Sequence, residues 1–373
     1  MKHSVEHRTV PLVDIAAQHR SLQEEIERAV LGVLESGKYI LGETVAKFEC
    51  EVAGYTGAKY AVGCASGTDA LLLALMAFDV KAGDEIITTP FTFFATAASI
   101  ARLGAKPVFV DIEPDTFNID PEKLEKKITP KTRGIMPVHL FGQTANMDHI
   151  MATARKHGLF VIEDAAQAIG ATYRGRQAGT IGDLGAFSFF PTKNLGCAGD
   201  GGLVTANDPG LAEKLTMLRV HGAHKQYFHK YVGINSRLDA IQAAILSVKL
   251  KRLDEWHHAR RRHAALYHEL FEGSKVRIPL VKPGNVSIFN QYVIQAHERD
   301  RLKEYLAGKG VSTFIYYPLS LSLQECFAYL GHKKGDFPVA EKATAEVLAL
   351  PVAPELTEED VRYVAAKVLE FYQ

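Results

Sequence analysis

Two residues with the potential for chemistry each follow a short apolar run of the chain. Asp164 comes just after the run Leu159–Ile162, and Lys193 comes just after the run Ala186–Phe189. Such runs are consistent with buried strands. A strand that delivers a carboxylate beside one that delivers an amine is the layout that binds pyridoxal 5'-phosphate (PLP): the lysine forms a Schiff base with the aldehyde, and the aspartate pairs with the ring nitrogen. The pattern therefore predicts a PLP site.

The predicted chemistry requires opposite charge states of the two side chains. Lys193 must be neutral to attack an aldehyde, and desolvation by the apolar segment Phe189–Leu195 would lower its pKa. Asp164 must be ionised, because a carboxylate keeps the ring nitrogen protonated through a charge-assisted hydrogen bond. The protonated ring then acts as an electron sink. Taken alone, Lys193 would be a surface lysine and Asp164 an acidic helix cap.

Five further residues complete the predicted cofactor site. Gly67 and Thr68 lie in a tight turn that enters a helix, where backbone N–H groups bind phosphate and glycine permits close approach. Ser188 could add a hydroxyl to the phosphate site, Gln167 could reach the ring hydroxyl, and Phe93 could stack on the ring. The alternatives are an ordinary capped helix for the turn and core packing for the phenylalanine.

The composition excludes several other classes of protein. The chain has 373 residues and 47% apolar content, which suits a protein with a substantial core. Lys plus Arg equals Asp plus Glu, which argues against a nucleic-acid partner. No apolar stretch approaches the ~20 residues that span a bilayer. The segment Met1–Arg8 lacks the apolar core of a signal peptide, so we expect a cytoplasmic protein without a membrane partner.

The cysteines and histidines do not form a pattern typical of metal sites. Cys50, Cys64, Cys197 and Cys326 are far apart and are read as reduced thiols rather than disulfides or zinc ligands. The basic, histidine-rich segment Trp256–His263 is read as the exposed face of a helix. No metal is expected.

Short apolar runs alternate with helix-like segments over the first two-thirds of the chain. This alternation predicts an α/β fold with a mostly parallel central sheet covered on both faces. Ligands of such sheets bind outside the carboxyl ends of the strands, where the predicted site residues fall. The predicted strands are Tyr60–Cys64, Glu85–Thr88, Pro107–Val110, Gly134–Val138, Leu159–Ile162, Ala186–Phe189 and Gly202–Thr205. The predicted helices are Asp69–Phe78, Phe93–Leu103, Asp120–Lys127, Met147–His157 and Leu211–Val220.

The last third of the chain has a different pattern. We expect one long helix over Arg237–Phe271, followed by a smaller α+β domain. The division predicts a large domain at residues 1–245 and a second part, with the connecting helix and the small domain, at residues 246–373. The elements expected beyond the helix are the strands Gln291–Gln295 and Ser312–Tyr316 and the helices Arg299–Lys309, Val339–Val347 and Glu358–Tyr372.

The segment Arg219–Arg237 contains several basic residues and histidines but no Asp or Glu. A local cationic loop in a protein of zero net charge indicates an anionic ligand, for which a diphosphate is a natural candidate. A solvated loop is the alternative.

Taken together, these segments resemble the DegT-type (DegT/DnrJ/StrS) nucleotide-sugar aminotransferases, PLP enzymes with the aspartate-aminotransferase fold (fold type I). The likeness covers nearly the whole chain. The motifs that carry it are Pro11–Asp14, Tyr39–Gly42, Ser66–Leu71, Glu163–Gln167, Ser188–Gly196, Gly199–Gly202 and Asn235–Asp239.

The resemblance implies a role for each matched residue. Lys193 would hold the cofactor and move the proton of the substrate, and the other predicted cofactor residues keep the roles given above. Asn235 would reach the cofactor phosphate of the neighbouring subunit, and Arg237 would point toward the sugar nucleotide, so the enzyme would be a homodimer with shared sites. Tyr316 and Tyr317 stand where many relatives carry His-Tyr near the sugar. Tyr316 thus departs from the pattern, which bears on sugar recognition.

The resemblance also implies the reaction: transfer of the amino group of L-glutamate, which leaves as 2-oxoglutarate, to a keto-sugar nucleotide. The segments Tyr227–His229 and Val232–Arg237 look most like the branch that aminates C3. The favoured acceptor is a UDP-linked 2-acetamido-3-oxo-uronate, whose carboxylate suits the cationic loop, and the alternative is a dTDP-linked 3-oxo-6-deoxyhexose. A sugar dehydratase and a non-catalytic paralogue are the less favoured alternatives, since Lys193 and Asp164 are both present. A nicotinamide dehydrogenase is disfavoured because no dinucleotide fingerprint follows a strand.

Overall fold

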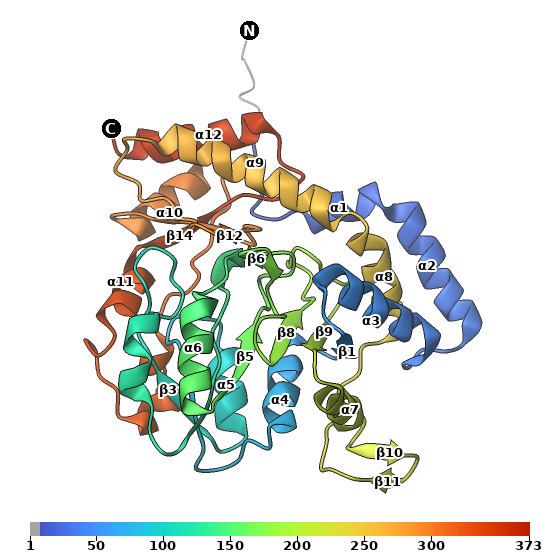
Figure 1. The fold of residues 1–373 in the computed structure, drawn as a ribbon. Helices are drawn as coiled ribbons and strands as arrows, with labels where there is room; N and C mark the ends of the chain where they lie inside the picture. Colours follow the sequence, from blue (N-terminus) through green and yellow to red (C-terminus); the bar gives the residue numbers. More distant parts are fainter. Residues whose placement is uncertain (1–7) are drawn as a thin grey trace.

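A central twisted sheet organises the protein, seen in a computed structural model that describes residues 8–373 (Figure 1). The expectation about a signal peptide concerns residues 1–7, which lie outside the described residues. In spatial order, the strands of this sheet are β1 (Tyr60–Cys64), β9 (Gly202–Ala206), β8 (Leu184–Ser188), β5 (Phe160–Asp164), β4 (Thr132–Ile135), β2 (Glu85–Thr88) and β3 (Lys106–Phe109). β9 runs antiparallel to β1 and β8, and the other neighbouring pairs are parallel. The predicted mostly parallel sheet is therefore confirmed.

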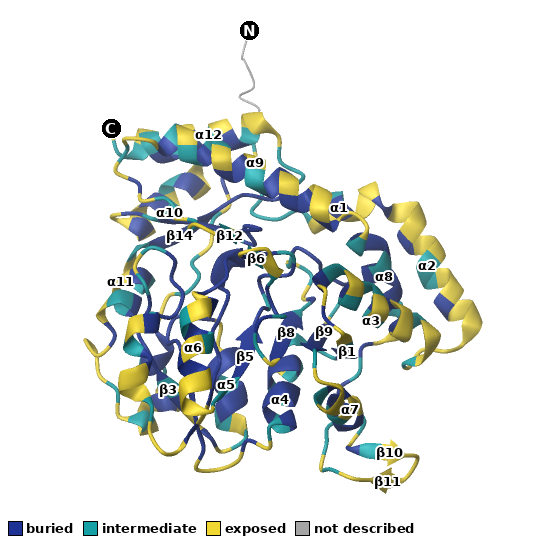
Figure 2. Cartoon of the chain, viewed as in Figure 1, coloured by how far each residue is buried: buried dark blue, intermediate teal, exposed yellow. Residues whose placement is uncertain are grey.

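Helices cover both faces of the sheet. Ile86 of β2 packs in one core cluster with the helices at residues 67–77 and 95–102, whereas its neighbour Ile87 packs in another with the helix at residues 147–157. Adjacent strand residues point to opposite faces, so both faces are buried, and the continuous apolar runs follow from this (Figure 2). These flanking helices are α4 (Gly67–Ala77), α5 (Ala95–Arg102), α6 (Met147–His157) and α7 (Pro209–Leu218).

The start and end of α6 show how local sequence sets these boundaries. The side chain of Asn146 accepts a hydrogen bond from the backbone of His149 at the N-terminus, and Gly158 ends the helix with φ of 63°. Asparagine caps and left-handed glycines are the usual signals at the two helix ends. By contrast, the predicted helix over Asp120–Lys127 is wrong. Two 3₁₀ turns, η1 (Pro121–Lys123) and η2 (Glu125–Lys127), close i→i+3 hydrogen bonds there instead.

Three N-terminal helices lie beside the sheet, at the right of Figure 1, and were not predicted. They are α1 (Ile15–Ser21), α2 (Gln23–Ser36) and α3 (Gly42–Thr56). Ile26 and Val33 of α2 and Phe48 of α3 share a core cluster with Leu246. α2 and α3 therefore pack against a helix near residue 250, and α3 also contacts the neighbouring strand β1.

The long helix expected over Arg237–Phe271 is divided in two. The first helix is α8 (Ala240–Leu250) and the second is α9 (Leu253–Phe271). Lys251 and Arg252 separate them. The face of α9 from Trp256 to His263 was expected to be exposed, and this is wrong for several members. Trp256, His257, Arg260 and His263 are buried.

The C-terminal part forms a smaller α+β unit, along the top and the left side of Figure 1. Its elements are β13 (Tyr292–Gln295), α10 (Arg299–Gly308), α11 (Pro338–Glu346), β14 (Val347–Leu350), α12 (Glu358–Phe371) and the 3₁₀ turns η4 (Leu321–Leu323) and η5 (Glu325–Leu330). β13 matches the predicted strand Gln291–Gln295. It pairs with β14, a strand that was not predicted. The predicted strand Ser312–Tyr316 is wrong, because only Phe314 forms a bridge, with Ala349, before the chain turns toward the sheet. The domain boundary at 245/246 stays a prediction.

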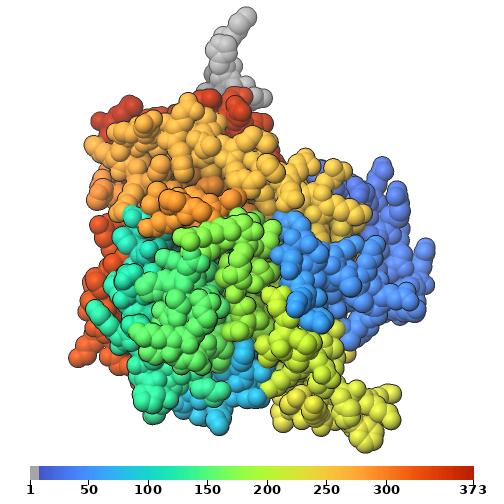
Figure 3. Space-filling model, in the orientation of Figure 1, coloured from blue at the N-terminus to red at the C-terminus, as the bar shows by residue number. Residues whose placement is uncertain are grey.

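Short elements complete the fold. They are η3 (Leu140–Gly142), β6 (Thr172–Tyr173), β7 (Arg176–Gln177), β12 (Asn285–Val286) and the hairpin β10 (Ala223–Lys225) and β11 (Phe228–His229). The hairpin projects from the body of the molecule, at the lower right of Figure 3. Within residues 8–373, none of the helices has the length and apolarity that crossing a bilayer requires.

Candidate active site

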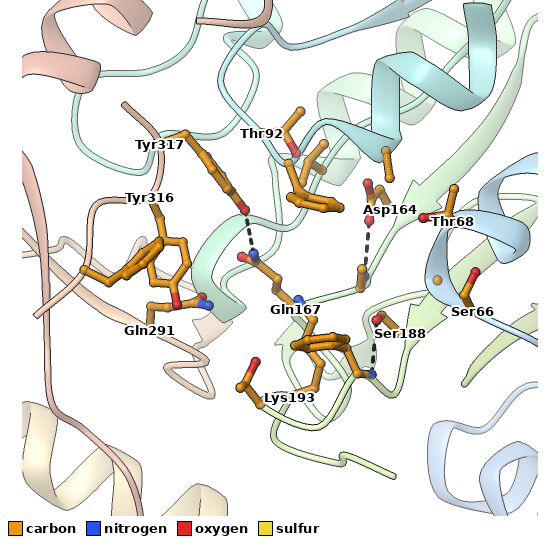
Figure 4. A pocket seen from close by; sticks show the side chains of 18 of the residues that line it. Ser66, Thr68, Thr92, Asp164, Gln167, Ser188, Lys193, Gln291, Tyr316 and Tyr317 are labelled. Carbon is orange, nitrogen blue, oxygen red and sulfur yellow. Dashed lines mark hydrogen bonds between the residues drawn. The ribbon is translucent and has the colours of Figure 1, made fainter. Parts of the chain in front are cut away.

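A cavity of about 820 Å³ opens between the carboxyl ends of the parallel strands and the segment 314–318 (Figure 4). It is large enough for a cofactor with a substrate. The predicted residues that line it are Gly67, Thr68, Phe93, Asp164, Gln167, Ser188, Lys193, Tyr316 and Tyr317. Residues far apart in the chain thus meet where the rule for open α/β sheets places a ligand.

Asp164, the last residue of β5, is buried at the inner end of the cavity. Its Oδ2 accepts a hydrogen bond of 2.7 Å from Oγ1 of Thr96, and its Oδ1 accepts one of 3.2 Å from the backbone N–H of Ala166. Burial raises the pKa of Asp164, while the bonds from Thr96 and Ala166 and the nearby charge of Lys193 oppose this rise. A cationic ring beside Asp164 would favour the ionised form.

A second buried carboxylate, Glu163, fixes the backbone behind Asp164. Its side chain accepts hydrogen bonds from the backbone N–H groups of Gly179, Ile181 and Gly182, at 2.6 to 2.8 Å. It also contacts Nε2 of His139 at 2.7 Å. Because Nδ1 of His139 accepts from Ala145 N–H, Nε2 is the nitrogen that carries the proton and donates.

Lys193 lies in the loop that follows β8. Its backbone N–H donates to Phe190 O at 2.8 Å, and the next side chain, Asn194, donates to Ile288 O at 3.1 Å. Burial lowers the pKa of Lys193 to about 8, against the opposing charge of Asp164. About a tenth of this amine is therefore neutral at pH 7, far more than for a lysine in water, and only the neutral amine attacks an aldehyde.

The first turn of α4 forms a cradle with Ser188. The side chain of Ser66 caps the helix by accepting from Asp69 N–H at 3.1 Å, which leaves the N–H groups of Gly67 and Thr68 without a helical partner. A Cβ at Gly67 would lie 2.6 Å from the Cβ of Ser188, so only glycine fits. Free N–H groups at a helix start, with hydroxyls beside them, suit a phosphate.

Gln167 connects the cofactor side of the cavity to the segment 314–318. Its Oε1 accepts from Phe141 N–H at 2.7 Å, and its Nε2 donates to the hydroxyl of Tyr317 at 3.1 Å (Figure 4). Phe93 is 58% exposed at the cavity, with its ring 6.3 Å from that of Tyr317. An exposed ring at this place is available to stack on a cofactor. Together the amine, carboxylate and phosphate cradle fit PLP.

Asn235 and Arg237 do not line the cavity of their own chain. Asn235 is exposed and Arg237 is half-buried, close to the base of the β10–β11 hairpin. Beside them, Ser236 Oγ accepts from Ala65 N–H at 3.1 Å, one residue before the cap of α4. Their predicted roles in a neighbouring subunit stay predictions.

Arg219, the first residue of the predicted cationic loop, does not belong to a free cationic surface. It is buried and forms an ion pair with Glu49, and it also donates to Gly63 O at 2.8 Å. The positive charge of the loop therefore rests on Lys225, Lys230 and Arg237.

Several cavity residues were missed by the sequence analysis. Gln291 and Phe314 line the C-terminal side, where no motif marks them. Thr92 lines the cavity and Thr96 lies behind Asp164. Thr92 lies before α5 and Thr96 lies in its first turn, so no helix periodicity in the sequence connects the two threonines.

The site and fold define a PLP-dependent aminotransferase of fold type I, and comparison with known proteins agrees. A model of the DegT/DnrJ/EryC1/StrS aminotransferase family matches residues 20–369. The chain belongs to this family. Its relatives include the pleiotropic regulatory protein of Geobacillus stearothermophilus, 53% identical over 98% of this chain and 99% of that protein.

Two other relatives carry the names of nucleotide sugars. One is the dTDP-3-amino-3,6-dideoxy-alpha-D-galactopyranose transaminase of Aneurinibacillus thermoaerophilus, 44% identical over 96% of this chain and 98% of its own. The other is the UDP-2-acetamido-2-deoxy-3-oxo-D-glucuronate aminotransferase of Pseudomonas aeruginosa, 41% identical over 96% of this chain and 99% of its own.

Solved structures give the same picture. DesV of S. venezuelae, in complex with a ketimine intermediate, superimposes with a TM-score of 0.96 at 40% identity, covering 98% of this chain and 99% of that one. NtdA of Bacillus subtilis, with bound cofactor PMP, superimposes with a TM-score of 0.90 at 32% identity. The match covers 98% of this chain and 86% of that one. PLP is the cofactor of this protein.

We predict that the apoenzyme takes up PLP covalently at a rate that rises about tenfold per pH unit below pH 8 and levels off above it. Only the neutral amine attacks, and the pKa of Lys193 is about 8. Stopped-flow absorbance of PLP capture measures this rate, with Lys193→Ala as the variant that captures none. A rate that keeps rising to about pH 10 would contradict the lowered pKa.

Gly67→Ala is expected to weaken PLP binding about tenfold or more, because the new Cβ would force the helix start away from Ser188. Equilibrium titration of the apoenzyme with PLP measures the effect. Gly32→Ala is the matched control, since a Cβ at Gly32 in α2 meets nothing within 4 Å. Equal PLP affinity of the two variants would refute the cradle.

Proposed function

We propose that this enzyme moves the amino group of L-glutamate to the C3 ketone of a nucleotide-linked sugar, and that it does so as a homodimer. The observation that carries this proposal is the amine of Lys193, with a pKa near 8, in one cavity with the buried carboxylate of Asp164. The cavity volume of about 820 Å³ leaves room beside the cofactor for a sugar substrate.

The residues divide the work between binding and proton transfer. PLP, when bound, supplies an aldehyde carbon that stores the amino group and a ring that accepts electrons. Gly67, Thr68 and Ser188 would bind its phosphate, and Asp164 would keep the ring nitrogen protonated. Lys193, once displaced by the amine of glutamate, would carry the proton from the Cα of the amino acid.

The same residues would serve the return half of the reaction. After 2-oxoglutarate leaves, Lys193 would deliver a proton to C3 of the sugar as the stored amino group is transferred. Because the amino group waits on the enzyme between the two substrates, the kinetics should be ping-pong. One water molecule would enter when 2-oxoglutarate is released, since the ketone oxygen comes from water, and one would leave when the sugar ketone accepts the amino group. The apolar lining from Phe93, Phe190 and Phe314 would keep the rest of the bulk water out of the cavity.

The favoured acceptor is a UDP-linked 2-acetamido-3-oxo-uronate. The relative from Pseudomonas aeruginosa is named for such a substrate, and the cationic Lys225 and Lys230 on the hairpin would attract its carboxylate or diphosphate. A dTDP-linked 3-oxo-6-deoxyhexose is the second candidate, favoured by the relative from Aneurinibacillus thermoaerophilus. Tyr316, with a hydroxyl where many relatives are expected to have an imidazole, lines the cavity and would contact the sugar.

The hairpin supports the proposal of a dimer. Tyr227, Phe228 and Val232 are 84%, 58% and 93% exposed on this projecting segment. Exposed apolar clusters of this kind mark protein interfaces. A partner subunit that covers them would bring Asn235, at the base of the hairpin, near a cofactor site that its own chain does not complete. The cytoplasmic location stays a prediction, which cell fractionation can test.

To test the function, purified protein is assayed with L-glutamate and a panel of keto-sugar nucleotides, with 2-oxoglutarate as the readout. We expect turnover with at least one 3-oxo sugar, higher for the UDP-uronate than for the dTDP-hexose. Lys193→Ala should lose all turnover while its circular dichroism spectrum is retained. Full activity of that variant, or sugar conversion without release of 2-oxoglutarate, would contradict an aminotransferase.

To test the shared site, an Asn235→Ala variant is mixed with a Lys193→Ala variant under conditions that exchange subunits. One of the two sites in each hybrid dimer would have both residues intact. Each hybrid dimer should therefore show about half of the activity of a wild-type dimer. Subunit exchange is verified with differently tagged chains. Exchange without any recovery would show that Asn235 acts within its own chain.

A further inference from the structure

Three buried side chains form a short hydrogen-bonded chain behind the cofactor site. Oγ1 of Thr92 lies 3.1 Å from Oγ1 of Thr96, which lies 2.7 Å from Oδ2 of Asp164. Thr92 is 3% exposed and Thr96 is 1% exposed, so bulk water does not compete for these bonds. Buried polar groups of this kind are costly unless each is satisfied, and here each has a partner.

Donor chemistry fixes the direction of the chain. An ionised carboxylate only accepts, so Thr96 must donate its single proton to Asp164. The oxygen of Thr96 then accepts from the hydroxyl of Thr92. If Asp164 instead carried a proton on Oδ2, both hydroxyls would rotate and the chain would run the other way. The direction of this chain therefore depends on the charge of the carboxylate.

The same turn of backbone carries the predicted stacking ring. Phe93 lies between the two threonines, and Thr96 N–H donates to Phe93 O at 3.3 Å at the start of α5. Phe93 lines the cavity, whereas Thr96 is absent from its wall and contacts Asp164 from behind. One turn thus fixes both the ring that would stack on the cofactor and the hydroxyl that orients its carboxylate partner.

We propose that Thr96, oriented by Thr92, is a positioning residue for the aminotransferase reaction: its hydroxyl holds the Asp164 carboxylate ionised and in one rotamer, opposite the ring nitrogen of the bound cofactor. The inference rests on the proposed function in one respect, namely the reaction that Thr96 would assist. The hydrogen bond itself acts on cofactor binding and on the ring nitrogen.

The electrostatics give the expected consequence of losing this bond. Burial raises the pKa of Asp164, and the hydrogen bond from Thr96 is the largest of the effects that oppose it. Without that donor, the carboxyl group shifts toward its neutral form. A neutral carboxyl holds the proton on the ring nitrogen less well, so the ring would be a weaker electron sink.

The test uses Thr96→Val, which keeps the shape but removes the hydroxyl, and Thr96→Ser, which keeps the hydroxyl. Three quantities are measured on each: the dissociation constant of PLP, the ¹⁵N chemical shift of the ring nitrogen in bound ¹⁵N-labelled PLP, and the single-turnover rate with L-glutamate alone. Thr96→Val should weaken PLP binding and slow the single turnover by about ten- to a hundredfold, as expected for a hydrogen bond to a charged group. Its ¹⁵N shift should move toward that of an unprotonated pyridine, and Thr96→Ser should restore all three quantities to within about threefold.

Two further variants separate positioning from folding. Thr92→Val should shift the same three quantities in the same direction but by less, because Thr96 keeps its bond to Asp164. Thr153→Val is the matched control: Thr153 is a buried threonine of α6 outside the cavity wall, and its variant should leave the ¹⁵N shift unchanged. If Thr96→Val does not fold, Thr96→Ala is measured in its place with the same expectations.

A ¹⁵N shift and a PLP affinity at wild-type values in Thr96→Val, or in Thr96→Ala, would overturn the proposal. So would a loss that Thr96→Ser fails to restore. These readouts need no sugar and are independent of the proposed acceptor. If wild-type protein binds PLP with a protonated ring but releases no 2-oxoglutarate from glutamate, the proposed function fails while the role of Thr96 is still decided.

Discussion

The structure depends on keeping an amine and a carboxylate in the same poorly hydrated cavity without letting them neutralise each other. Desolvation favours the uncharged form of both groups, and it is the reason that the pKa of Lys193 falls while that of Asp164 rises. The hydrogen bonds to Asp164 then favour its charged form. Within residues 8–373 the amine of Lys193 has no hydrogen-bond partner, so burial makes it easier to deprotonate, whereas the bonds to Asp164 resist protonation of the carboxylate. The surrounding residues bury Lys193, and they donate hydrogen bonds to Asp164.

The sheet supplies the rigidity that this balance needs. β5 ends in Glu163 and Asp164, which point to opposite sides because neighbouring strand residues alternate. Glu163 is fixed by three backbone N–H groups and by His139, so the strand end cannot rotate. Because the neighbouring residue Glu163 is held in place, the strand positions Asp164 more accurately than a free loop would.

The sequence was sufficient to predict the strands that are buried on both faces and the functional residues that follow them. Runs such as Tyr60–Cys64 and Glu85–Thr88 are short and apolar, and the structure has strands at those bounds. The same reasoning located most of the cavity, because the carboxyl ends of parallel strands meet at one edge. The helices α1 to α3 were missed, and the partner on which α2 and α3 pack, α8, is remote in the chain. Ser312–Tyr316 has the apolar and aromatic content of a strand, but its path is set by contact with the cavity, which propensity does not encode.

The cavity has walls from distant parts of the chain. Residues 66 to 200 form the cofactor side, and the hydroxyl of Tyr317, 150 positions after Gln167, completes the opposite side. A chain cut short before residue 314 would lack that wall, so water would reach Lys193 and its pKa would return toward the ordinary range of lysine. Such a truncated product would therefore capture little of the coenzyme, and it would leave vitamin B6 free for the intact enzyme.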